Sequence, residues 1–199
     1  KAAEMYLQAG RPEESRDMIL NILKTDDRLA DAWAILARAE LSRDNTTAAE
    51  QAISKALEMN PAKARYYVVK ARILEATDRA YEEGLALEKA LEISPEPFIF
   101  KELAAFHLNR GDHDMAEKIL QRLSQNFPDS AQTYTLIGNF YRGINEREKA
   151  EHAYLQAIEK AIKPEDEMAN LADFYYETGK NRQAAKLVEK ILVSQPGHP

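Results

Sequence analysis

The chain has 199 residues, of which 45% are hydrophobic and 30% are charged, and its formal net charge is -6. This composition is typical of an ordered domain or a short repeat array and excludes a disordered segment. An acidic chain repels phosphate backbones, so nucleic acid is not expected as a partner.

Three further classes are disfavoured by the composition. Cysteine is absent, which excludes disulfides and thiolate metal sites. No apolar run approaches the roughly 20 residues that span a bilayer, so direct membrane insertion is not expected. The localisation stays open between cytoplasm and bacterial periplasm. The chain contains only 7 Gly and 8 Pro and is rich in Ala, Leu, Glu and Lys, which favours helices.

Residues 1–29 are interpreted as the end of a two-helix unit that lacks its first turn. The segment 30–63 predicts a complete pair of helices, because small and apolar residues recur three, four and seven positions apart. These positions hold Trp33, Leu36, Ala37, Ala49, Ile53 and Ala56. Glu40 stands where an aromatic residue would continue the pattern.

The segment 64–96 is the irregular unit. Tyr67, Ala71 and Leu74 fit a first helix, but Glu83 falls on a position that is small in the other units, and Gly84 follows it. We therefore expect a one-residue slip between Arg79 and Gly84, with an unusual turn or helix packing there.

Three more units follow at 97–130, 131–164 and 165–198. The clearest is 131–164, with Tyr134, Ile137, Gly138, Tyr141, Ala150, Tyr154 and Ala157 in phase. Prolines cannot continue a helix and are expected to close the units, at Pro61, Pro95, Pro128 and Pro196. We expect Gly111 and Gly179 in the turns between paired helices, and Asp129 or Ser130 as a helix cap.

A helical unit repeated every 34 residues or so, with this pattern of small and aromatic residues, resembles the tetratricopeptide repeat (TPR) family. The resemblance covers essentially the whole chain. It implies an all-α fold, a right-handed α-solenoid of antiparallel helix pairs, as a single array over 1–199 with one partial and five full repeats. The regular units also resemble long bacterial arrays, and we expect the array to continue beyond both ends.

The family binds partners with the first helix of each unit, which lines a concave inner face. The resemblance therefore implies that another protein or peptide contacts these positions: Ile35, Arg38, Arg65, Val69, Arg72, Phe98, Lys101, Glu102, Gln132, Leu136, Asn139, Arg142, Asn170 and Asp173.

The charges on these helices differ between the two halves. Arg38, Arg65, Arg72 and Lys101 are expected to form a basic strip, whereas Asp166, Asp173 and Glu177 make the other end acidic. Such a groove would orient an extended peptide by charge. The alternative is a solvated helix face with scattered charges.

One TPR subfamily binds the terminal carboxylate of heat-shock chaperones with Lys, Asn and Arg side chains. With Lys101 as the first position, the matching places hold Ala105, Leu136, Asp166 and Asn170. Because Asp166 would repel a carboxylate, this role is disfavoured.

No motif for chemistry is found. A Gly-rich phosphate loop, a His-Glu-x-x-His motif and a nucleophile elbow are all absent from the sequence. His107 and His113 do not have metal-ligand spacing. We therefore expect no enzyme activity, no catalytic or metal-binding residues and no cofactor.

The function that we expect is a protein-protein interaction scaffold that assembles a multiprotein complex, and bacterial envelope or polysaccharide export is one setting. The alternative is a substrate-recruiting or regulatory arm of a larger enzyme, such as a glycosyltransferase. Self-association through the two uncapped ends stays open, because Val188, Ile191 and Leu192 of the last helix have no predicted cover.

Overall fold

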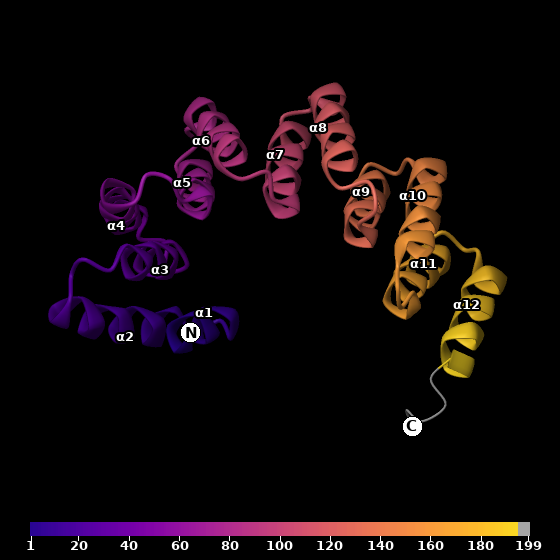
Figure 1. Ribbon diagram of the computed structural model, residues 1–199, viewed down its shortest axis with the longest axis horizontal. Helices are drawn as coiled ribbons and strands as arrows, with labels where there is room; N and C mark the ends of the chain where they lie inside the picture. The colour runs from indigo at the N-terminus through magenta and orange to yellow at the C-terminus, as the bar shows by residue number, and fades with distance from the viewer. Residues whose placement is uncertain (195–199) are drawn as a thin grey trace. The chain divides into compact units, whose positions relative to one another are not determined.

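The computed structural model describes residues 1–194, and within them the chain forms twelve α-helices and no strand (Figure 1). The helices are α1 (Ala2–Gln8), α2 (Pro12–Thr25), α3 (Ala30–Leu41), α4 (Thr46–Met59), α5 (Ala64–Ala76), α6 (Ala80–Ile93), α7 (Pro97–Asn109), α8 (His113–Asn126), α9 (Ala131–Gly143), α10 (Arg147–Lys160), α11 (Glu165–Glu177) and α12 (Asn181–Ser194). The all-α helical-repeat fold is confirmed.

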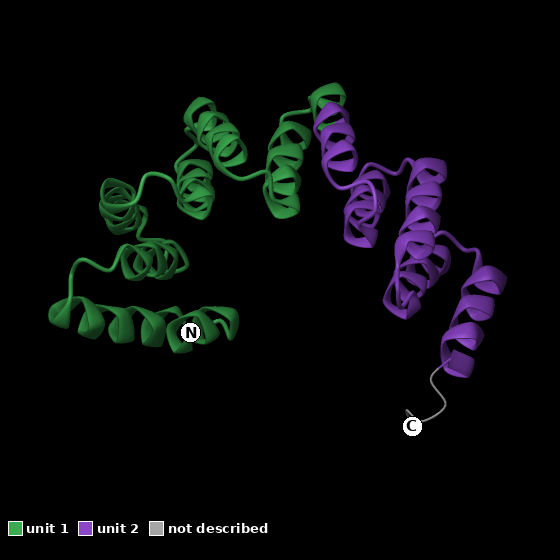
Figure 2. Cartoon of the chain, in the orientation of Figure 1, with its two compact units in different colours: residues 1–116 green, residues 117–199 purple. Residues whose placement is uncertain are grey.

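The chain divides into two compact units, 1–116 and 117–199, which Figure 2 colours separately. Consecutive helices pack as pairs: α3 with α4 and α5 with α6 in the first unit, and α9 with α10 and α11 with α12 in the second. The predicted repeats 30–63, 64–96, 131–164 and 165–198 each contain one such pair, and the division into repeats stays a prediction. Pro196, which was expected to close the last repeat, lies outside the described residues.

Every turn inside a helix pair contains one residue with positive φ. Gly111 and Gly179 occupy this place, as predicted, with φ of 75° and 78°. Asp44, Asp78 and Asn145 take the same conformation at φ of 58°, 54° and 61°. Among residues with a side chain, Asp and Asn tolerate this region best. The turn is therefore one recurring piece of backbone that three residue types can form.

The other helix ends also have local causes. The helices α4, α6 and α8 end two residues before Pro61, Pro95 and Pro128. Ser130 is the N-cap of α9, and its side chain accepts a hydrogen bond from the Thr133 backbone N–H. Asp129 does not cap the helix and pairs instead with Lys160.

The expected slip between Arg79 and Gly84 is wrong. The helix α6 starts at Ala80, as far from the start of α5 as α4 is from the start of α3. The missing residue lies later, because residues 94–96 join α6 to α7 whereas residues 60–63 join α4 to α5. Gly84 has a packing role, since a Cβ there would lie 3.0 Å from the Phe106 ring.

Small residues allow close approach of the helices within each unit. Ala37, Ala49 and Ala56 are fully buried in the core of the first unit. In the second unit, a Cβ on Gly138 would lie 2.8 Å from the ring of Tyr154, which is itself 0% exposed. The small residue and the large ring therefore fill one shared space, as the sequence pattern predicted.

The aromatic residue that opens the repeat pattern has a second role. Trp33 and Tyr134 are only partly buried. Trp33 Nε1 donates to the Asp27 carbonyl at 2.7 Å, and Tyr134 Oη donates to the Pro128 carbonyl at 3.0 Å. Each side chain thus ties its helix to the loop that precedes it.

Polar bonds join successive repeats in the second unit. Tyr141 Oη donates to Glu117 Oε1 at 2.7 Å, and Lys149 Nζ donates to the same oxygen at 3.1 Å. Hydrogen bonds from these two groups lower the pKa of Glu117. Glu151 likewise accepts from a tyrosine and a lysine, with Tyr175 Oη donating to Oε1 and Lys180 Nζ donating to Oε2. The carboxylate and the tyrosine are 24 residues apart in both cases.

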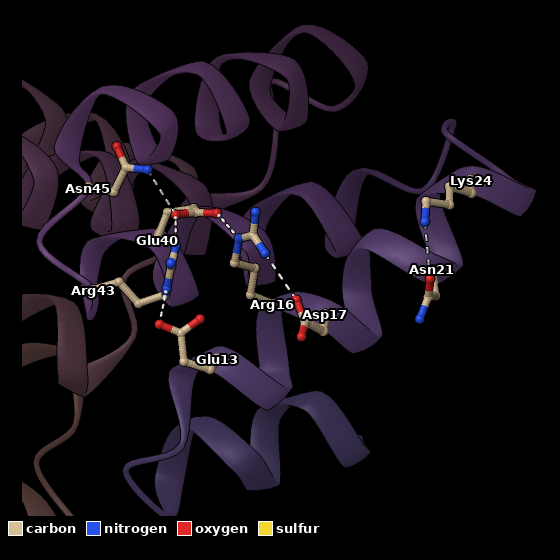
Figure 3. A network of polar contacts seen from close by, with 8 residues as sticks. All are labelled: Glu13, Arg16, Asp17, Asn21, Lys24, Glu40, Arg43 and Asn45. Carbon is tan, nitrogen blue, oxygen red and sulfur yellow. Dashed lines mark hydrogen bonds and ion pairs between the residues drawn. The ribbon is translucent and has the colours of Figure 1, made fainter.

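The first unit reverses these roles at the same 24-residue separation. Glu40 stands in the tyrosine position and Arg16 in the glutamate position (Figure 3). The Glu40 side chain is 6% exposed. It accepts hydrogen bonds from Arg16 Nε at 2.8 Å, Arg43 Nη1 at 2.6 Å and Asn45 Nδ2 at 3.1 Å. Glu40, which replaces the aromatic residue of the repeat pattern, is therefore a buried carboxylate with three hydrogen-bond donors.

Candidate functional site

The odd-numbered helices form one side of each unit. In the first unit, Figure 2 shows α3, α5 and α7 on the inner side of the curve and α4 and α6 on the outer side. Contacts between α1 and α3 and between α3 and α5 join neighbouring first helices. We call the surface of α1, α3, α5 and α7 the inner face of the first unit.

Two of the four residues in the expected basic strip are already paired with carboxylates. Arg72 Nη2 lies 2.9 Å from Glu102 Oε1, across α5 and α7. Arg38 Nη1 lies 3.7 Å from Glu4 Oε1, across α3 and α1. A partner that binds either arginine must therefore compete with a carboxylate of the neighbouring repeat.

The other two cations, Arg65 and Lys101, are exposed. No carboxylate of the described residues lies within ion-pair distance of either one. The Arg65 guanidinium lies over the Phe98 ring, 5.3 Å from its centre. Phe98 is half-buried and Val69 is buried on the neighbouring helix, while Ile35 is half-buried on α3. Arg65, which has no ion-pair partner among the described residues, therefore lies against the apolar side chain of Phe98.

Carboxylates of three neighbouring helices gather near Arg72. Glu75 of α5, Glu83 of α6 and Glu102 of α7 line a small cleft, together with Arg72 and Phe106. Burial and the neighbouring Glu75 raise the pKa of Glu83, although Arg110 opposes the shift. The sequence analysis did not select Glu75. Its position three residues after Arg72 places both side chains on one helix face, and this spacing could have identified it as an inner-face residue.

In the second unit the predicted residues lie on α9 and α11. Asn139 accepts a hydrogen bond from Tyr154 Oη at 2.7 Å, and Arg142 pairs with Glu177. One of the three expected acidic groups is thus compensated, and Asp166 and Asp173 stay exposed. The remaining predicted residues are exposed Gln132 and half-buried Leu136 and Asn170.

The second unit also contains a cleft that the sequence analysis did not predict. It has a volume of about 500 Å³ and lies between α8 and α10, with Tyr134, Ile137 and Tyr141 of α9 among its lining residues. Lys149 and His152 line it from α10. The repeat pattern identifies the tyrosines as packing residues and does not reveal that their edges stay open.

The last helix pair exposes the apolar surface that was expected. Val188, Leu192 and Val193 are 47%, 63% and 74% exposed. They line a groove of about 940 Å³ with Tyr176. Self-association through this surface stays a prediction.

No group of three or more His, Cys, Asp or Glu side chains within residues 1–194 is arranged to hold a metal ion. None of the helices in that part of the chain has both the length and the apolar composition needed to cross a bilayer.

Solved structures with the same fold include several TPR proteins. PilF of Pseudomonas aeruginosa is 18% identical with a TM-score of 0.64, and the match covers 99% of this chain and 90% of that one. A TPR protein of Thermus thermophilus is 18% identical with a TM-score of 0.67, over 88% and 96% of the two chains. YrrB, described as having an unusual peptide-binding site, is 18% identical with a TM-score of 0.52, over 90% and 93%.

Sequence models of the tetratricopeptide repeat match most of the chain. One model matches residues 1–64 and 36–96, a second matches 102–130 and a third matches 131–159. With the paired helices, the in-phase small residues and the repeated left-handed turn, these matches show that the chain belongs to the tetratricopeptide repeat family.

Proposed function

We propose that the chain is a non-catalytic scaffold whose inner face binds a peptide or helical segment of another protein and so holds a multiprotein complex together. The observation that carries this proposal is the exposed surface of α5 and α7. There, Arg65 and Lys101 are exposed with no carboxylate partner among residues 1–194, and the Arg65 guanidinium lies over the half-buried Phe98 ring. Desolvated apolar anchors beside unpaired charges are the ingredients of a specific interface.

The second helices of the first unit also carry cations, and two of these are held by neighbouring side chains. Arg79 on that side is held by Glu50 and Glu82, at 2.6 and 2.5 Å. The Lys55 ammonium lies over the Trp33 ring of its own repeat, 4.0 Å from the ring centre. A cation that is ion-paired has less to gain from a partner, so the absence of an ion pair at Arg65 and Lys101 within the described part of the chain favours the inner face.

The setting of such a scaffold is suggested by two structural neighbours. PilW, which is 15% identical with a TM-score of 0.64, is described as a type IV pilus biogenesis factor. YrrB is described as having a peptide-binding site. We infer a bacterial envelope assembly as the setting for this chain. The alternative, a recruiting arm of a larger enzyme, predicts that the complete gene also encodes a catalytic domain.

The proposal is tested by site-specific photo-crosslinking in the native cells. A benzophenone amino acid is placed at Ala105 or Asn139 on first helices, and at Tyr81 or Leu155 on second helices as matched controls. All four positions are exposed. The proposal predicts a discrete protein adduct from Ala105 or Asn139 and none from the controls. Adducts that form only at Tyr81 or Leu155 would place the binding surface on the second helices and refute it.

A further inference from the structure

Arg65, Phe98 and Lys101 form a surface on α5 and α7 that we call the cationic patch, and buried Val69 lies one turn after Arg65 on α5. Arg65 and Val69 are four residues apart on α5, and Phe98 and Lys101 are three apart on α7, so each pair shares a helix face. The 5.3 Å approach of the Arg65 guanidinium to the Phe98 ring brings the two helices together at this point.

The cationic patch lies where both helices begin. Neither α5 nor α7 has an acidic residue in its first turn, and neither N-cap residue makes a side-chain capping bond. The backbone N–H groups of a first turn carry partial positive charge, which adds to the potential from Arg65 and Lys101. Three carboxylates lie near these first turns, and each is already engaged. Glu96 accepts a hydrogen bond from Ser94, Glu102 pairs with Arg72, and Asp31 of α3 accepts hydrogen bonds from Lys63 and Tyr66.

Internal interactions set a boundary to this positive surface. Arg72 is held by Glu102 at 2.9 Å. The charge of Lys70 helps to lower the pKa of Glu82 on α6. Lys70 therefore acts on the second helix of its own repeat. An incoming anion therefore meets two free cations at Arg65 and Lys101, whereas at Arg72 it must displace Glu102.

We propose that the cationic patch binds an acidic peptide segment in which carboxylates flank an apolar side chain. This proposal rests on the inner face as a binding surface and specifies the class of partner. The peptide carboxylates pair with Arg65 and Lys101, and the apolar side chain covers the exposed part of the half-buried Phe98 ring. Because both cations are exposed, the attraction acts mainly on orientation and association and is weakened by salt.

The test uses the whole chain and three fluorescein-labelled peptides of one design: Glu-Glu-Leu-Phe-Glu-Glu, the same peptide with Gln for Glu, and the same with Lys for Glu. Fluorescence anisotropy at 50 mM and 500 mM NaCl measures their affinity. We expect the Glu peptide to bind most tightly and to lose affinity in high salt.

Two double variants distinguish the effect of the cationic patch on peptide affinity from the effect of the total charge of the chain. Arg65→Gln with Lys101→Gln removes the free cations, and we expect affinity for the Glu peptide to fall about five- to thirty-fold. Arg182→Gln with Lys186→Gln removes the same charge from exposed positions of α12 and should leave the affinity within two-fold. Phe98→Leu, with an unchanged melting curve, should weaken the Glu and Gln peptides alike.

The proposal is overturned if the Gln or Lys peptide binds as well as the Glu peptide, or if both double variants lose affinity equally. It is also overturned if no peptide binds up to 1 mM. In that case a photo-crosslink from Ala105 would keep the inner face as a binding surface for a partner of other chemistry. The absence of both peptide binding and crosslinks would refute the scaffold proposal as well.

Discussion

The buried carboxylate of Glu40 offers the sharpest test of how the repeats are held together. Replacing Glu40 with Gln keeps the size of the side chain but removes the charge that Arg16 and Arg43 share at 2.8 and 2.6 Å. Hydrogen bonds to charged groups contribute about 1.5–3 kcal/mol each, and breaking a buried pair costs about 3–5 kcal/mol. Both arginines keep a second carboxylate, Asp17 or Glu13, which reduces the loss. We therefore expect Glu40→Gln to lower the free energy of unfolding by about 2–4 kcal/mol.

Urea unfolding measures this change with a local and a global probe. Trp33 is the single tryptophan of the chain and lies on α3 with Glu40, so its fluorescence reports the first unit. Circular dichroism at 222 nm reports all helices. The fluorescence transition should move to lower urea more than the dichroism transition does, because a repeat array need not unfold as one cooperative step. A Glu40→Gln transition within about 0.5 kcal/mol of wild type would show that the network contributes little.

A transplant provides the control. Arg16→Glu, Glu40→Tyr and Asn45→Lys together install in the first unit the Glu–Tyr–Lys arrangement that Glu151, Tyr175 and Lys180 form in the second. We expect this triple variant to recover at least half of the stability that Glu40→Tyr alone loses. If stability does not recover, the positions that are 24 residues apart in the two units are not structurally equivalent.

Further tests address the turns, the core and the carboxylates. Gly111→Ala forces a side chain to φ of 75° and should destabilise by about 1 kcal/mol, whereas Asn145→Gly should be neutral or slightly stabilising; thermal melts that rank the two in the opposite order would contradict the turn assignment. Gly138→Ala places a Cβ 2.8 Å from buried Tyr154 and should cost about 1–3 kcal/mol, and Tyr154→Leu in the same chain should relieve part of that cost; equal melting temperatures for wild type and Gly138→Ala would refute this. The pKa of Glu117 is lowered from 4.5, so its contribution to stability is present above that pH and is lost as the pH falls through the lower folded value; the melting-temperature gap between wild type and Glu117→Gln should close between pH 5 and pH 3, and a constant gap would exclude this linkage.

The helices and their pairing could be predicted because small residues at fixed spacing, such as Ala37 and Gly138, indicate where a paired helix approaches closely. The position of the irregularity could not. Gly84 suggested that the repeat loses one residue between α5 and α6. The apolar pattern of the helices does not reveal the length of the loops between them, and the shortened loop is residues 94–96, between α6 and α7. The structure assigns Gly84 to contact with Phe106 instead.

The inner-face residues were named from the family resemblance, and their use by a partner stays a prediction. Their charge state could not be read from the sequence. Arg72 and Glu102 are 30 residues apart, and only the stacking of α5 on α7 brings them within 2.9 Å. The basic strip therefore has fewer free cations than the sequence suggested. Glu40 was recognised as unusual, but its partner Arg16 lies in the preceding repeat and was invisible to a pattern read one repeat at a time.

The polar links between repeats also make the junction between α2 and α3 chemically different from those between α8 and α9 and between α10 and α11. Glu117 and Glu151 each receive a tyrosine from the repeat that follows, whereas Arg16 receives the carboxylate of Glu40. A repeat that carries Glu40, if moved to follow α8 or α10, would set its carboxylate against a glutamate, and a repeat that carries Tyr141, if moved to follow α2, would leave Arg16 without its buried counter-charge. Apolar stacking alone would accept either order, since the small and large residues are equivalent from repeat to repeat. The charge at the Arg16–Glu40 junction therefore disfavours the exchange of its repeats with those at the Glu117 and Glu151 junctions, and penalises such misordered pairings during folding.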